Sequence, residues 1–134
     1  VHDELADGRS IEIAPFSESL SFISDEAILR RVLVNALKNA LEASPVGSTV
    51  SVGCGGCGSR VEFFVRNDGV IEETVQGNIF KRYYSTKGGN RGLGTYSMKL
   101  LTEEYLRGEV SFRSSVESGT VFTFVIPNLG VRDG

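Results

Sequence analysis

The sequence is poor in several features that mark particular classes of protein. In 134 residues it has no tryptophan, one histidine and two cysteines. Its longest apolar runs fall far short of the roughly 20 residues that cross a bilayer, and no basic-then-apolar leader opens the chain. It lacks a basic excess as well, with 14 Lys and Arg against 17 Asp and Glu. A duplex-DNA binder normally needs a basic face, so we expect no nucleic-acid partner. The short apolar runs and the few cysteines lead us to expect a soluble, cytoplasmic chain.

The scarcity of cysteine and histidine limits metal and redox chemistry. Cys54 and Cys57 stand in one glycine-rich run, but a tetrahedral zinc site would need two further ligands. A redox pair belongs at a helix N-terminus, whereas this pair lies between two strand-like runs. We therefore interpret the run as the tip of a hairpin, with a metal or redox role as a minor alternative. His2 precedes acidic residues, but Gly8 and clustered polar residues break any helix there, so we expect a frayed N-terminus.

The rest of the composition is that of an ordinary globular protein, with 40% hydrophobic and 23% charged residues. The length fits a single domain over 1–134, with a core at about 11–127 and a loose tail at 128–134. Strand-like and helix-like segments mix without a regular βαβ alternation, which favours an α+β fold. The expected architecture is a two-layer sandwich, in which a mixed, mostly antiparallel sheet is covered on one face by about three helices. The predicted strands cover 11–14, 20–23, 49–52, 60–66, 109–114 and 120–126, and the predicted helices cover 26–43, 72–80 and 95–106.

The segment 26–43 is the clearest of the predicted helices. Ser24 or Asp25 suits its N-cap, strong helix formers fill it, and the run 44–47 with its proline and glycine ends it. Its apolar residues, Val34 among them, fill a wide arc, which is typical of a helix that packs on a sheet.

The same helix carries a polar stripe made of Asn35, Asn39 and Glu42, spaced at i, i+4 and i+7. Asparagine is a mediocre residue in the middle of a helix, because its side chain competes for backbone hydrogen bonds. Two asparagines one turn apart indicate either a solvated polar face or amide oxygens that bind a hard cation.

A second group of glycines lies at 88–94, directly before the last predicted helix. Glycines let the backbone approach a ligand, and a helix N-terminus offers free N–H groups to phosphate oxygens. Lys87 and Arg91 add positive charge there. The run is no Walker loop, since GxxxxGK[ST] does not occur. Phosphate binding and a flexible loop before an ordinary helix start both remain open on this pattern alone.

Taken together, these segments resemble the ATP-binding catalytic domain of sensor histidine kinases. That domain belongs to the superfamily shared with DNA gyrase and the mismatch-repair and heat-shock ATPases, which have the Bergerat fold. The resemblance extends over about 11–127, nearly the whole chain. The resemblance rests on five segments that match family motifs. They are the N box at 33–43, the first glycine box at 65–69, the F box at 79–87, the second glycine box at 91–96 and the closing hairpin at 118–124.

The resemblance implies a role for each matching residue. Asn39 would hold Mg²⁺ through its amide oxygen, with Asn35 one turn earlier beside the phosphates of ATP. Asn67 would accept a hydrogen bond from the adenine amino group, with Gly69 beneath the ring and Thr120 near the adenine end. The remaining phosphate contacts would come from Thr86, Lys87, Arg91, Gly92, Leu93 and Gly94, of which Lys87 would act with Asn35 and Asn39 in catalysis.

The chain departs from the family pattern at several of these positions. Asn67 replaces the usual Asp, and a charge-assisted hydrogen bond is roughly twice as strong as a neutral one. Ala43 stands where an aromatic ring often covers the adenine, and Glu42 where many members have a basic residue. Asn90 replaces the first glycine of GxGLG, and Val70 follows the first glycine box where a second glycine is usual. We expect weaker or differently shaped nucleotide binding.

Asn35 also separates kinase from hydrolase chemistry. The ATPase branches of the superfamily have a Glu at this position as general base for water, and an amide cannot take a proton. We therefore predict transfer of the γ-phosphoryl group to a histidine on the phosphoacceptor helical hairpin of a longer sensor kinase. The further partner would be a response regulator receiver domain. The fragment would be monomeric and the parent kinase dimeric, and the sequence leaves open whether the parent is anchored in a membrane.

Two other functions remain open on the sequence. One is a degenerate docking module that binds a partner without turnover, which the departures from the family pattern favour. The other is a protein-serine kinase of the anti-sigma type, which has the same fold and would phosphorylate a separate target protein.

Overall fold

The described residues form a sheet of six strands, in the order β1-β2-β3-β4-β6-β5. In the computed structural model, residues 2–4, 10–13, 24–57, 59–71, 76 and 91–128 are described. Only β2 and β3 run parallel, and every other neighbouring pair is antiparallel. The strands are β1 (His2–Glu4), β2 (Ser10–Ile13), β3 (Thr49–Cys57), β4 (Arg60–Asn67), β5 (Glu109–Ser115) and β6 (Gly119–Pro127).

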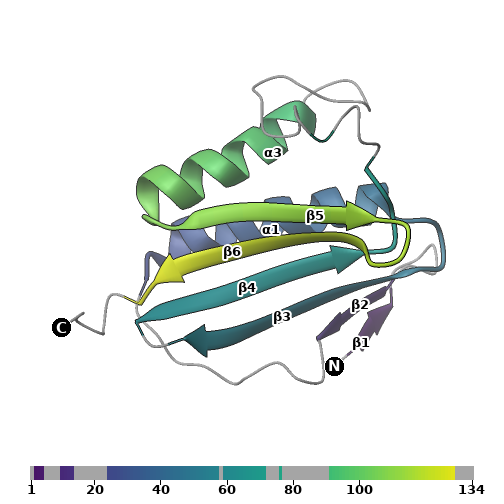
Figure 1. Ribbon diagram of the computed structural model, residues 1–134, viewed down its shortest axis with the longest axis horizontal. Helices are drawn as coiled ribbons and strands as arrows, with labels where there is room; N and C mark the ends of the chain where they lie inside the picture. Colours follow the sequence, from purple (N-terminus) through teal and green to yellow (C-terminus); the bar gives the residue numbers. More distant parts are fainter. Residues whose placement is uncertain are drawn as a thin grey trace.

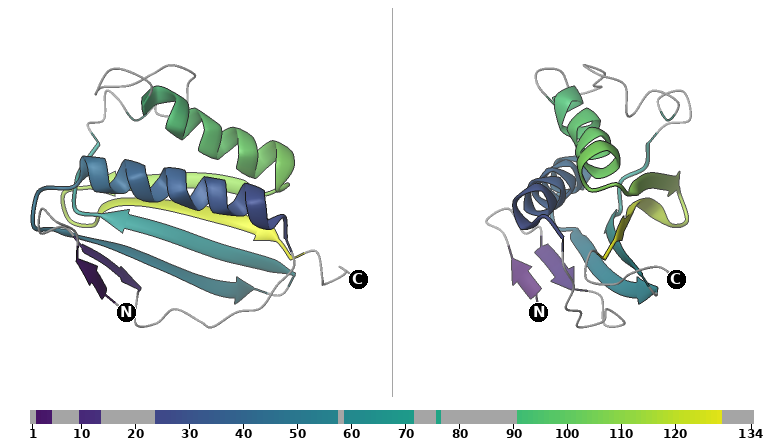
Figure 2. Two further views of the ribbon diagram at one scale, coloured as in Figure 1. Left: turned by 180° about the vertical axis from the view of Figure 1, so that it is seen from behind. Right: turned by 90° about the vertical axis from the view of Figure 1, so that its left-hand side faces the viewer.

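Two described helices cover one face of this sheet (Figures 1 and 2). They are α1 (Glu26–Ala43) and α3 (Arg91–Leu100), and α3 continues as a π-helical turn, η1 (Leu101–Tyr105). The α1 helix makes the crossover that the parallel β2–β3 pair requires. The two-layer α+β architecture predicted from the sequence is therefore confirmed. The expected strand at 20–23 lies outside the described residues, and so does the third expected helix, at 72–80, apart from Gln76.

Local signals define both ends of α1 at the predicted residues. The carboxylate of Asp25, not Ser24, caps the helix, because its Oδ1 accepts from the backbone N–H of Ile28 at 3.1 Å. At the other end the Ser44 hydroxyl donates to the carbonyl of Ala40 at 2.6 Å. The Ser44 backbone N–H also donates to the Leu41 carbonyl at 3.2 Å, so the last turn closes before Pro45.

Three sequence-based expectations about element bounds are wrong. The glycine-rich run with Cys54 is no hairpin tip but part of β3, where Cys54 lies opposite Phe63 of β4. Backbone pairing with β4 extends the strand through the glycines, although glycine weakens a strand locally. The N-terminus is no frayed end either, because β1 pairs with β2 and places His2 opposite Glu12.

The third wrong bound is the start of α3, which begins at Arg91 and not at Thr95. The glycines of the second glycine box therefore form its first turn instead of leading into it. Buried Met98 and Leu101 further along anchor the helix, so its first turn tolerates residues of low helix propensity.

The hydrophobic core lies between the helices and the inner face of the sheet. Alternate residues of β4 and β6 point inward, so that Val61 lies opposite Ile126 and Val65 opposite Phe122 on the face that α1 and α3 cover. Val34, expected in the apolar arc of α1, is 47% exposed and lies outside this core. The buried cluster comprises Val32, Ala36, Ala40, Val50, Val61, Val65, Met98, Leu101, Leu106, Val110, Phe122, Phe124 and Ile126.

Asn128, which we expected to begin a loose tail, is hydrogen-bonded to the turn between β3 and β4. The backbone N–H of Asn128 donates to the carbonyl of Ser59 at 2.7 Å, which ties the end of β6 to the β3–β4 turn. Residues 129–134 lie outside the described part of the chain. None of the described helices combines the length and the apolar character that crossing a bilayer would require.

Candidate functional site

Several predicted site residues meet where β4 ends. The carboxyl end of β4, the last turn of α1, the first turn of α3 and the β5–β6 turn all lie at the same end of the molecule (Figures 1 and 2). Asn67 is the last residue of β4, and the register of the sheet places it opposite Thr120 of β6. Both residues are buried, with exposed fractions of 2% and 3%. Residues more than fifty positions apart in the sequence are thus brought together by strand pairing.

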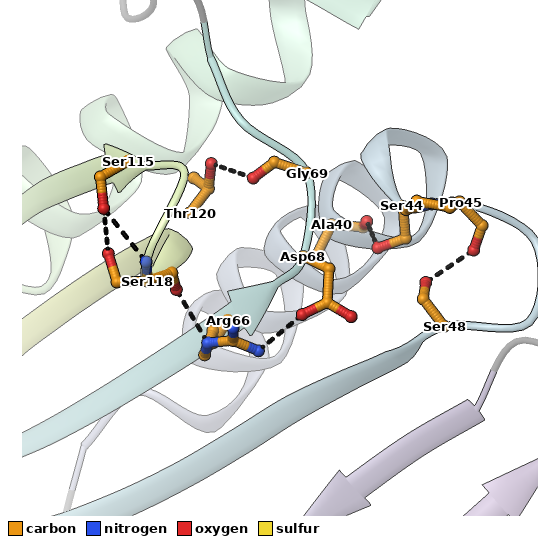
Figure 3. Close-up of polar contacts among 10 residues, drawn as sticks. All are labelled: Ala40, Ser44, Pro45, Ser48, Arg66, Asp68, Gly69, Ser115, Ser118 and Thr120. Atoms are coloured by element: carbon orange, nitrogen blue, oxygen red, sulfur yellow. Dashed lines mark hydrogen bonds and ion pairs between the residues drawn. The ribbon is translucent and has the colours of Figure 1, made fainter.

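A chain of hydrogen bonds holds the backbone that follows Asn67. The N–H of Ile71 donates to Ser114 Oγ at 2.7 Å, and Ser114 Oγ lies 2.7 Å from Thr120 Oγ1. Thr120 Oγ1 in turn donates to the carbonyl of Gly69 at 2.8 Å, a bond drawn in Figure 3. A carbonyl only accepts and an amide N–H only donates, so the Ser114 hydroxyl must be the donor to Thr120.

This proton order gives Thr120 a structural role. Its hydroxyl hydrogen is used on the Gly69 carbonyl, so Thr120 holds the segment 69–71 in place. Ser114 shares this task and was missed by sequence reasoning. Its only signal is the pairing of Ser114 with Thr120 across β5 and β6, which a sequence does not reveal.

Glycine is required at two positions around Asn67. A Cβ on Gly69 would collide with the carbonyl oxygen of Ala43 and lie 2.8 Å from Asn67 Nδ2. A Cβ on Gly119, whose φ is +71°, would collide with the carbonyl oxygen of Asn67. The end of α1 therefore packs closely against Gly69, and Gly119 at the start of β6 packs closely against Asn67.

The buried amide of Asn67 is incompletely satisfied. Within the described part of the chain, its Nδ2 has no hydrogen-bond partner. Leaving such a donor unpaired costs about 1–3 kcal/mol, so buried polar groups are nearly always paired. This unpaired donor lies where β4, β6 and the end of α1 converge, which makes Asn67 a candidate ligand-binding residue.

On the outer face of the sheet, Arg66 links the end of β4 to the β5–β6 turn (Figure 3). Its Nε donates to the carbonyl of Ser118 in the β5–β6 turn at 2.9 Å, and a second nitrogen contacts the Asp68 carboxylate at 3.0 Å. Residues alternate between faces at the end of β4, so Asp68 lies on the side away from the buried Asn67 amide. Asp68 is accordingly half-exposed.

The polar stripe of α1 runs toward this site. Asn35 and Asn39 are both half-buried, at the border between the buried and exposed faces, whereas Glu42 is exposed. Ala43, directly after the stripe, contributes the carbonyl that faces Gly69. Both asparagines are therefore placed on one helix face that leads toward Asn67.

The phosphate end of the predicted site is described only in part. Arg91, Gly92, Leu93 and Gly94 form the first turn of α3, at the same end of the molecule as Asn67. Thr86 and Lys87 lie outside the described residues. The structure thus brings together the residues expected around the base and positions the helix start expected near the phosphates.

Comparisons with known proteins agree with this arrangement. The heme sensor protein HssS of Staphylococcus aureus is 30% identical over 131 residues, covering 95% of this chain and 28% of HssS. The chain thus spans less than a third of the length of the curated relatives it matches.

Solved structures of histidine kinases have the same fold. The catalytic domain of ThkA is 28% identical with a TM-score of 0.75, over 88% of this chain and 76% of that one. Full-length ShkA in complex with AMPPNP is 27% identical with a TM-score of 0.78, over 91% of this chain and 26% of that one. ThkA in complex with the response regulator protein TrrA is 25% identical with a TM-score of 0.74, over 90% of this chain and 34% of that one.

The family match covers most of the described structure, from the residue before the α1 cap to beyond the end of β6. Residues 24–130 match the family described as histidine kinase-, DNA gyrase B- and HSP90-like ATPases. This range includes every residue of the candidate site, from Asn35 to Thr120. The chain therefore belongs to the family of histidine kinase-, DNA gyrase B- and HSP90-like ATPases, a family of ATP-binding domains.

Proposed function

We propose that this chain is the catalytic ATP-binding domain of a two-component sensor kinase, acting on a histidine of a separate phosphoacceptor helical hairpin. The observation that carries the proposal is the buried amide of Asn67, whose Nδ2 has no partner among the described residues. This amide fits a purine ring, which offers polar atoms at its edge. The kinase identity of ThkA and ShkA supports the same function.

The residues of this chain would position the reactants, since phosphoryl transfer needs placement and charge neutralisation more than covalent chemistry. ATP, when bound, supplies the phosphoryl group. Asn39 would hold Mg²⁺ through its amide oxygen, and Asn35 would contact the phosphates one turn earlier. Lys87 and the N–H groups in the first turn of α3, from Arg91 to Gly94, would neutralise phosphate charge.

Asn35 would also keep the domain a kinase. An amide cannot accept a proton, so no general base for water stands at this position of α1, and hydrolysis would be negligible. The ThkA complex with TrrA supports a response regulator as a further partner. We propose that the fragment is monomeric, that the parent kinase is dimeric, and that this domain lies in the cytoplasm.

Calorimetric titration with ADP, with and without Mg²⁺, tests the nucleotide site. We expect binding that Mg²⁺ strengthens, and we expect Asn39→Ala to remove the part that depends on Mg²⁺. Asn128→Ala is the matched control. It makes the same change directly after β6, at the end of the sheet far from the candidate site, and should bind like the unmodified chain. Absence of binding at millimolar nucleotide would contradict the proposal and favour the docking module.

The chemical identity of the phosphoacceptor needs a second assay. The chain is incubated with a separately produced phosphoacceptor hairpin and labelled ATP, and the product is then treated with acid. Label that acid removes indicates phosphohistidine, as we propose. Label that survives acid would instead indicate a serine kinase of the anti-sigma type.

A further inference from the structure

The Asn67 amide is the side chain through which this site can donate a hydrogen bond to a base. Its Nδ2 is buried and without a partner among the described residues. The hydroxyls of Ser114 and Thr120 have spent their hydrogens on Thr120 and on the Gly69 carbonyl. Among Asn67, Ser114 and Thr120, the described polar side chains at this end of β4, Asn67 therefore retains a hydrogen to donate.

Asp68 cannot provide the carboxylate that Asn67 lacks. It directly follows Asn67, but the alternation of the strand puts it on the opposite face, where it is 49% exposed and paired with Arg66 at 3.0 Å. A carboxylate at this site would accept hydrogen bonds and offer none at neutral pH. The Asn67 amide instead has one acceptor, Oδ1, and one donor group, Nδ2, on the same buried side chain.

Resting on the proposed function, we propose that Asn67 makes the base site accept 6-oxopurine nucleotides as well as adenine nucleotides. Adenine presents a 6-amino donor beside the N1 acceptor. Hypoxanthine and guanine present the reverse, a 6-oxo acceptor beside an N1–H donor. A primary amide matches either pattern after a half-turn of its terminal torsion, because its oxygen and nitrogen exchange places. A carboxylate can accept from the adenine 6-amino group or from the N1–H of a 6-oxopurine, but it repels the 6-oxo oxygen.

The Asn67 amide can rotate while the neighbouring backbone stays in place. The backbone of segment 69–71 is tied to β5 and β6 by hydrogen bonds that do not involve the Asn67 amide. Turning the amide therefore breaks none of the contacts that hold the segment. The specificity would reside in one side chain on a fixed frame.

The test measures binding of ADP and IDP to the full chain by calorimetry, in the presence of Mg²⁺. We expect the two dissociation constants to lie within about tenfold of each other. Asn67→Asp should raise the ratio of the IDP to the ADP dissociation constant by about tenfold or more, since a lost or repulsive hydrogen bond of this kind is worth at least that factor. Asn128→Asp adds the same charge at the other end of the sheet and should leave the ADP-to-IDP ratio unchanged.

Each outcome bears on one proposal. Binding of ADP with IDP weaker by more than about tenfold in the unmodified chain overturns the inference and leaves the proposed function standing. Failure of both nucleotides to bind overturns the proposed function itself. Should Asn67→Asp not fold, purine riboside diphosphate, which has no group at C6, provides the comparison in the unmodified chain. It should bind more weakly than both ADP and IDP, and equal binding of all three would show that the amide does not read C6.

Discussion

At the scale of single residues, two buried threonines show how strongly context sets the value of one hydroxyl group. Thr102 in η1 is fully buried, and within the described part of the chain its Oγ1 has no hydrogen-bond partner. Thr120 in β6 is almost equally buried, but its Oγ1 bridges Ser114 and the carbonyl of Gly69. The same side chain is therefore a cost at one position and a structural link at the other.

We expect Thr102→Val to raise the free energy of unfolding by about 1 kcal/mol, because it removes an unpaired buried hydroxyl and keeps the shape of the side chain. Thr120→Val is the matched comparison and should lower it by about 1–2 kcal/mol, because Ser114 and the Gly69 carbonyl each lose a partner. Urea denaturation followed by circular dichroism measures both. Equal effects of the two substitutions would contradict this account of their hydroxyls.

At the scale of elements, the N-terminus of α1 is capped by one side chain, which the sequence alone could not identify. Ser24 and Asp25 both suit an N-cap, and only the geometry shows that Asp25 accepts from the Ile28 N–H. The cap orients the helix that carries Asn35 and Asn39 and ends at Ala43 against Gly69. Stabilisation of α1 by the Asp25 cap therefore also stabilises the arrangement of these site residues.

Asp25→Ala is expected to lower the free energy of unfolding by about 1 kcal/mol, because the Ile28 N–H loses its acceptor and the helix loses a favourable negative charge at its N-terminus. Ser24→Ala, one residue earlier, is the control and should change stability by less than about 0.5 kcal/mol. Thermal or urea unfolding of the two variants decides between the residues. A larger loss with Ser24→Ala would show that the cap is misassigned.

The elements that could be predicted are those whose signals are local. The bounds of α1 follow from a cap, a run of helix formers and a proline, all of which lie within the segment. The extension of β3 through Cys54 and the pairing of β1 with β2 depend on partner strands, so a reading of local propensity missed them. The start of α3 was placed too late because glycine was treated as a boundary, whereas distant contacts of Met98 decide that the helix forms.

The candidate site was predictable in its membership and not in its geometry. The resemblance to histidine kinases named Asn67, Gly69 and Thr120, and strand pairing then placed them together. It did not reveal Ser114, the direction of the hydrogen-bond chain or the unpaired Nδ2 of Asn67. These features arise from contacts between segments far apart in the sequence, which no local pattern encodes.

At the scale of the whole molecule, the site and the hydrophobic core share their supporting elements. Val65 of β4 is buried in the core two residues before Asn67, and Phe122 of β6 is buried two residues after Thr120. Ala40 of α1 belongs to the same core, three residues before the carbonyl that faces Gly69. The site therefore cannot lose its arrangement by itself while the sheet and α1 remain packed.

This coupling predicts that a bound nucleotide stabilises the entire domain in one cooperative transition. At an ADP concentration one hundred times its dissociation constant, we expect the free energy of unfolding to rise by about 2.7 kcal/mol. The dependence of that free energy on urea should keep the same slope, because the surface exposed on unfolding is nearly unchanged. Urea titrations followed by circular dichroism and by the fluorescence of the tyrosines should coincide. Two separate transitions, only one of which shifts with ADP, would show that the end of β4 unfolds independently of the core, and the frame on which base recognition depends would then not be rigid.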